Sequence, residues 1–144
     1  MAYEAIDIIY EEIRAVILAL NIKEAKEYFD FDNIPDSLTD NAFVLAPFDF
    51  DQGDFKRPDN RYPVYNLKAA IKVNISYVLP SNNIIQTMKV LMKKVEDIIK
   101  AILAITTGED EKDNIIFNSA NSRVDGNKLI YEILFNLNYR VKNI

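Results

Sequence analysis

Four aspartates between residues 49 and 59 are the first candidates for chemistry in this chain: Asp49, Asp51, Asp54 and Asp59. Carboxylate oxygens are the ligands that hard cations such as Ca²⁺ take from proteins. The spacing does not fit an EF-hand loop, because the glycine and the terminal glutamate of that loop are missing. A solvated acidic loop is the simpler interpretation, and we expect no metal site.

A second pair of carboxylates, Asp36 and Asp40, is a candidate for general acid–base catalysis. Such a pair needs burial and a third group that orients it, and the sequence indicates neither. The chain has no histidine, the usual general base near neutral pH, and no cysteine. Its three glycines are isolated, so they form no phosphate-binding loop. We therefore expect no catalytic residue, no cofactor and no enzyme activity.

Lysines and acidic residues alternate in the segment 89–100, with Lys89, Lys93, Lys94 and Lys100 around Glu96 and Asp97. Mixed signs are typical of a solvated helix face, and contact with nucleic acid or an acidic partner is the alternative. The net charge of −5 argues against a protein that coats phosphate backbones. The negative charge remains compatible with a protein that DNA passes closely without binding to it.

Length and composition indicate one globular domain over residues 1–144. The chain has 49% apolar and 27% charged residues, as ordinary folded proteins do. Residues 1–20 are acidic and lack the basic start of a signal peptide. The apolar runs are shorter than the roughly 18 residues that a membrane span needs. We expect a soluble, unexported protein.

Two long runs alternate between apolar and polar residues, as strands with one buried face do. One spans about Tyr65–Leu79 and is stopped by Pro80, and the other spans Lys128–Val141. A further strand, Asn114–Val124, precedes the turn Asp125-Gly126-Asn127, which favours a hairpin because aspartate and glycine tolerate positive φ. The long runs have an apolar face for helices and a largely polar face.

Helical spacing marks two other segments. The first helix is expected at about Tyr3–Leu20. The second is expected at about Asn82–Ile105, capped by Ser81 or Asn82 and followed by Gly108 and an acidic linker. Ten large apolar residues on one stripe of this second helix must cover a sheet or a partner.

The remaining segments are less regular. Ile22–Phe29 suggests another helical turn or two, Asp30–Asp40 a loop, and Asn41–Ala46 a short strand closed by Pro47. Phe48–Pro63 is expected to be a long loop or a projecting hairpin. The sequence thus predicts an α+β fold of order α-β-β-α-β-β, with an antiparallel or mixed sheet of about four strands and two helices packed on one face.

Three segments carry a resemblance to a known family. They are FDNIPDSLTDNAFVLAP (Phe31–Pro47), VYNLKAAIKVNISYVLP (Val64–Pro80) before the long helix, and the hairpin Ile116–Arg140 ending in LIYEILFNLNYR. With the first helix, they resemble the tail terminator, or tail completion, proteins of long-tailed bacteriophages. The likeness is a pattern of elements that covers most of the chain, without an invariant motif.

The resemblance implies a virion structural protein without catalytic residues. Proteins of this family form a ring, usually a hexamer, on the head-proximal end of the tail tube. The ring ends tube polymerisation and joins the tail to the head–tail connector protein. Subunits of such rings meet through sheet augmentation and loop contacts, and DNA passes the lumen without specific binding. The expected location is the virion tail or neck, and the host cytoplasm during assembly, with no membrane.

Aromatic side chains near the Phe48–Pro63 segment are the expected subunit or partner contacts, because interfaces are enriched in aromatics. They are Phe48, Phe50, Phe55, Tyr62 and Tyr65. The alternative is that these side chains pack on their own domain.

Two other functions stay open at the level of sequence. One is a neck or head-completion protein of the same virion region, whose elements are similar. The other is a small α+β binding module that recognises a peptide or ligand at a sheet edge. A small hydrolase or nuclease has the least support.

Overall fold

The computed structural model describes residues 6–25, 36–52, 64–105 and 115–142. In these ranges it has three helices and six strands. The helices are α1 (Ile6–Leu18), α2 (Asp36–Thr39) and α3 (Ile84–Leu103). The strands are β1 (Lys23–Glu24), β2 (Ala42–Leu45), β3 (Asp49–Gln52), β4 (Val64–Val78), β5 (Ile115–Asp125) and β6 (Lys128–Lys142).

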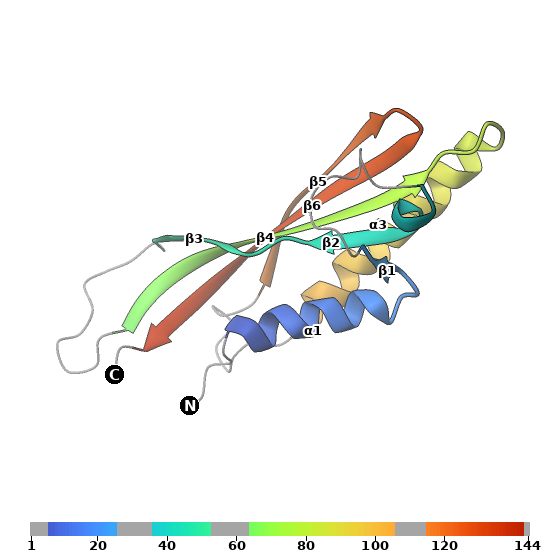
Figure 1. The fold of residues 1–144 in the computed structure, drawn as a ribbon. Helices are drawn as coiled ribbons and strands as arrows, with labels where there is room; N and C mark the ends of the chain where they lie inside the picture. The colour runs from blue at the N-terminus through green and yellow to red at the C-terminus, as the bar shows by residue number, and fades with distance from the viewer. Residues whose placement is uncertain (1–5, 26–35, 53–63, 106–114, 143–144) are drawn as a thin grey trace.

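One twisted sheet holds all six strands in the order β1-β2-β4-β6-β5, and β3 pairs with β4 beyond the end of β2 (Figure 1). Strands β4 and β6 pair along their full length, from Val64 opposite Lys142 to Val78 opposite Lys128. Every pairing is antiparallel except β1 with β2. The predicted α+β class and mixed sheet are confirmed. The sheet has six strands where about four were expected, because β1 and β3 add two short ones.

Helices α1 and α3 lie on the same face of the sheet, as predicted (Figure 1). Each contributes one apolar stripe at three- and four-residue spacing. The stripes are Ile9, Ile13 and Ile17 of α1, and Leu91, Val95, Ile98 and Ile102 of α3. They form one core with the inward residues of the sheet, including Ile71, Val73, Ile75, Ile133 and Phe135, all at most 1% exposed.

The opposite sheet face is mostly polar, in agreement with the alternation. Lys72 and Glu132 form an ion pair across β4 and β6 at 4.0 Å, and Asn74 and Asn136 are half-buried beside them. A small apolar cluster of Val44 and Ile130 interrupts this face, and both side chains are buried. The face is therefore not uniformly solvated.

Three local predictions were wrong. Residues 23 and 24 form β1 rather than a helical turn, because Lys23 and Glu24 continue the sheet beside Ala42 and Phe43. The end of the expected loop 30–40 is the one-turn helix α2. Helix α3 is preceded by Asn83 in the left-handed conformation, with no side-chain cap, rather than capped by Ser81 or Asn82.

The predicted hairpin of β5 and β6 is confirmed. Gly126 follows β5 with a φ of 60°, a value that glycine adopts at little cost. The pairing shifts register between Phe117 and Ser119, so that Asn118 forms a bulge. Below the bulge, Phe117 meets Phe135 edge to face, with ring centroids 5.8 Å apart. The outer edge of β5 has no paired strand among the described residues.

Candidate assembly surface

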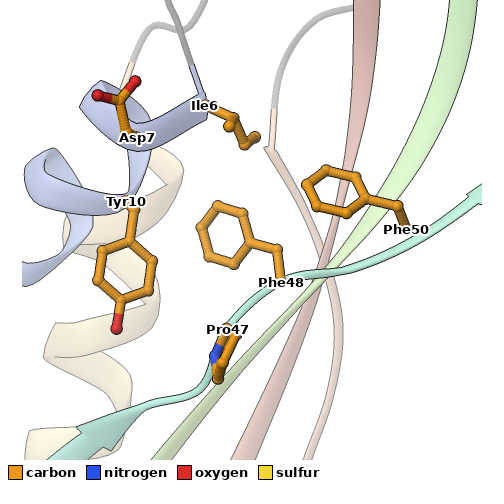
Figure 2. A pocket seen from close by; sticks show the side chains of 6 residues that line it. All are labelled: Ile6, Asp7, Tyr10, Pro47, Phe48 and Phe50. Atoms are coloured by element: carbon orange, nitrogen blue, oxygen red, sulfur yellow. The ribbon is translucent and has the colours of Figure 1, made fainter.

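An apolar pocket of about 320 Å³ lies between the start of α1 and the segment that joins β2 to β3. Its lining comes from two parts of the chain, as Figure 2 shows: Ile6, Asp7 and Tyr10 from α1, and Pro47, Phe48 and Phe50 from the segment after β2. The lining is almost entirely apolar. It suits an apolar side chain better than a polar metabolite.

Tyr10 and Phe48 hold the two sides of the pocket together. The Tyr10 hydroxyl donates a hydrogen bond of 2.7 Å to the backbone oxygen of Leu45, at the end of β2. The rings of Tyr10 and Phe48 are tilted by 55°, with centroids 5.5 Å apart. Pro47 then ends β2, and Phe48 turns onto the core. The pocket therefore has a fixed inner wall.

Phe50 forms the outer rim. It lies on β3 opposite Ala69, whose small side chain is fully buried. The Phe50 side chain remains 48% exposed. A large apolar side chain at the mouth of an apolar pocket is a feature of protein contact surfaces.

The rim carries one acidic side chain, Asp7, which is exposed and forms no ion pair with another described residue. Asp49 and Asp51 are exposed too, but they alternate with Phe50 along β3 and therefore point to the opposite, polar face of the sheet. Asp51 has Lys68 opposite it on β4, whereas Asp49 has Ala70 there. Asp7 lies in the first turn of α1, where the helix dipole favours a negative charge. The pocket thus combines an apolar centre with one exposed negative charge, that of Asp7.

The structure brings two of the five expected contact residues into this pocket, Phe48 and Phe50. Tyr65 lies on β4 opposite Val141, and its side chain is not among the described ones. Phe55 and Tyr62 lie outside the described residues. The sequence did not indicate that Ile6 and Tyr10 share the pocket, because both belong to the apolar stripe of α1.

The other candidates for chemistry have structural explanations. Asp40 accepts a hydrogen bond of 3.0 Å from the backbone N–H of Val78, which ties the chain after α2 to the end of β4. Burial and the negative charge of Asp40 raise the pKa of Tyr77, whose hydroxyl donates to Asn41 Oδ1 at 2.6 Å. Asp36 begins α2, and its side chain is not among the described ones.

No group of three potential metal ligands occurs in the described part of the chain. Asp49 and Asp51 share one face of β3, and Asp54 and Asp59 fall outside the described ranges. No helix in those ranges has the length and apolarity to cross a bilayer.

The charged residues of α3 form ion pairs with one another along the helix. This agrees with the interpretation of this face as a solvated one. Lys100 contacts Glu96 at 2.8 Å, and Lys93 contacts Asp97 at 3.4 Å. The hydrogen bond between Lys100 and Glu96 lowers the pKa of the Glu96 carboxyl and raises the pKa of the Lys100 amine. Lys94 instead donates to the backbone oxygen of Leu20 at 2.9 Å, where α1 has ended.

Comparison with known proteins shows an α+β fold that also occurs in a virus-like particle. No protein-family model and no curated protein matches the sequence. Among solved structures, one chain of the virion of a native gene transfer agent (GTA) particle is similar in fold, with a TM-score of 0.51 and 15% sequence identity. The match covers 94% of this chain and 92% of that one. The likeness therefore concerns the whole fold.

Proposed function

We propose that this protein is a structural component of a phage-like virion and acts without enzyme activity. The observation that supports it most is the likeness of nearly the whole fold to a chain of the GTA virion. The resemblance of the sequence to tail terminators points in the same direction. Neither argument depends on a catalytic group.

Within the virion, the protein forms a ring, of six copies in the family it resembles, on the head-proximal end of the tail tube. The ring ends tube polymerisation because a closed contact surface offers no site for another tube subunit. Its other side meets the head–tail connector, and DNA passes through the lumen. The lysines and asparagines of the polar sheet face suit a lumen that does not grip DNA.

Two exposed regions support a role in assembly. The apolar pocket has Phe50 at its mouth, and β5, at the other edge of the sheet, pairs with no further strand of the described residues and exposes Ile116 and Phe117. A free edge with apolar side chains is suited to bind another chain. Phe48, Phe50 and Tyr65 belong to the contact surface in this proposal, together with Phe55 and Tyr62.

A second candidate is a binding module for an apolar peptide. The pocket between α1 and β3 favours it, because the wall is preformed and the lining apolar. Such a module would bind a peptide as a monomer, whereas a tail terminator must assemble into a ring.

The test uses the purified protein and the tail tube protein of the same virion. Added during tube assembly, it should limit tube length and appear in negative-stain images as a ring at one tube end. Phe50→Asp should weaken this effect, and Leu18→Asp, at a 44% exposed position on the far end of α1, is the matched control. Tubes of unchanged length, with no ring at their ends, would contradict the proposal.

A further inference from the structure

Helix α3 extends past the end of its packing partner. Lys94 contacts Leu20, just beyond α1, so the turns of α3 that precede Leu91 reach past the end of α1. Figure 1 shows these first turns reaching past the end of α1. None of the residues 84–90 is buried.

The extended part of α3 is apolar and basic on one face. Ile85, Lys89 and Met92 follow one another at helical spacing, so their side chains share a face. Ile85 is 71% exposed, the highest value among the large apolar residues described, and Met92 is 50% exposed. Lys89 is exposed and has no ion-pair partner among the described residues.

This face complements the pocket at the start of α1. The pocket offers an apolar hollow with Asp7 on its rim, and the helix offers a protruding isoleucine with a lysine one turn further on. Two copies of the pocket that faced each other would bring Asp7 of one copy near Asp7 of the other. Contact between unlike surfaces is therefore favoured by charge.

The two surfaces lie at opposite ends of one molecule (Figure 1). A single chain therefore cannot bring them together, but two chains can. From this placement we infer that the first turns of α3 in one copy dock into the α1–β3 pocket of a second copy, with Ile85 in the pocket and Lys89 beside Asp7. The occupant of the pocket is thus another copy of this chain.

Such a contact is heterologous, because each copy uses a different surface toward each of its neighbours. Repetition gives a closed ring where the rotation between copies closes, and an open chain where it does not. The inference deepens the proposed function, since it rests on the ring and assigns two surfaces to the ring contact. It does not require the ring to bind a tail tube.

The chain has no cysteine, so introduced cysteines report this contact without interference. The test variant carries Ile85→Cys and Phe50→Cys in the same chain, and both positions are exposed. Mild oxidation should give a ladder of disulfide-linked dimers, trimers and larger species on a non-reducing gel. The control variant carries Leu18→Cys with Phe50→Cys and should cross-link about tenfold more slowly, as expected for random collisions rather than docking.

Mixing single-cysteine variants tests whether the contact joins unlike surfaces. A copy with only Ile85→Cys and a copy with only Phe50→Cys, one of them enlarged by a tag, should give mixed dimers and nothing larger. Equal amounts of mixed and like-with-like dimers would overturn the inference. So would equal rates of ladder formation in the test and control variants.

Charge reversal tests the assignment of Lys89. In the double-cysteine variant, Asp7→Lys should slow ladder formation roughly fivefold, the scale expected for an exposed ion pair replaced by repulsion. Adding Lys89→Asp should restore the rate. Absence of either effect would overturn the pairing of Lys89 with Asp7.

The outcomes separate this contact from the proposed function. If rings form but their Ile85→Cys and Phe50→Cys sites do not cross-link, the contact is wrong and the function stands. If the ladder forms but tube length is unaffected, the contact stands and the tail terminator function is wrong.

Discussion

The two halves of α3 have the same apolar spacing and different environments. From Leu91 to Leu103 the helix buries four residues, Leu91, Val95, Ile98 and Ile102, against the sheet and α1. From Ile84 to Val90 it has four large apolar residues and buries none of them completely. Amphipathic spacing continues through both halves, so the pattern alone does not distinguish them.

The difference shows that apolar spacing identifies a face that must be covered, and the tertiary structure determines what covers it. In the second half, the sheet and α1 lie against the stripe. The first half of α3 reaches past Leu18, where α1 ends, and Ile85 and Val90 stay exposed there. Clustered apolar residues that stay exposed on a helix are typical of a surface that binds another protein.

The largest expected effect comes from the buried half. Ile98→Ala removes a fully buried side chain from the centre of the core and should lower the free energy of unfolding by about 2–5 kcal/mol. Chemical denaturation followed by far-UV circular dichroism, at a concentration that keeps the protein monomeric, measures this change.

Ile85→Ala is the matched control, since it makes the same substitution in the same helix at a 71% exposed position. It should change the free energy of unfolding of the monomer by less than about 0.5 kcal/mol. Similar losses at both positions would mean that the first half of α3 packs on its own molecule, contrary to the comparison.

Much of this architecture could be predicted from the sequence, because the long elements have strong periodicity. The alternation in β4 and β6 and the helical spacing in α1 and α3 placed these elements to within about three residues at each described end. The Asp125-Gly126 sequence placed the hairpin. These signals depend only on neighbours along the chain.

The short strand β2 was predicted at Asn41–Ala46 and is present, but β1 and β3 depend on partners distant in sequence and were not predicted. β1 exists because Lys23 and Glu24 lie beside β2, and β3 because Phe50 lies opposite Ala69. The pocket was missed for the same reason. It requires Tyr10 to reach the oxygen of Leu45, 35 residues away, and no local pattern contains that information.

A smaller effect is expected where the two halves of α3 meet. Lys94→Met keeps the aliphatic chain but removes the hydrogen bond to the Leu20 oxygen at the end of α1. We expect a loss of about 1 kcal/mol, because a cation that satisfies a free carbonyl after a helix also complements the helix dipole. Chemical denaturation measures it.

Lys93→Met serves as the control for Lys94, since Lys93 forms only exposed ion pairs with Glu96 and Asp97. Its effect should stay below about 0.5 kcal/mol. Equal effects would show that the contact between Lys94 and α1 does not mark the boundary between the two halves.

The smallest effect concerns the ion pairs that only the second half of α3 carries. The hydrogen bond from Lys100 lowers the pKa of Glu96, so the folded state binds a proton there less readily than the unfolded chain. The stabilisation is present above the ordinary glutamate pKa and is lost as the pH falls through the lowered value. NMR titration of the Glu96 carboxyl should show this, and Lys100→Met should return the pKa toward its ordinary value. Lys89→Met, in the first half, should leave it unchanged, and an ordinary pKa in the unsubstituted protein would show that the Lys100–Glu96 pair does not form in solution.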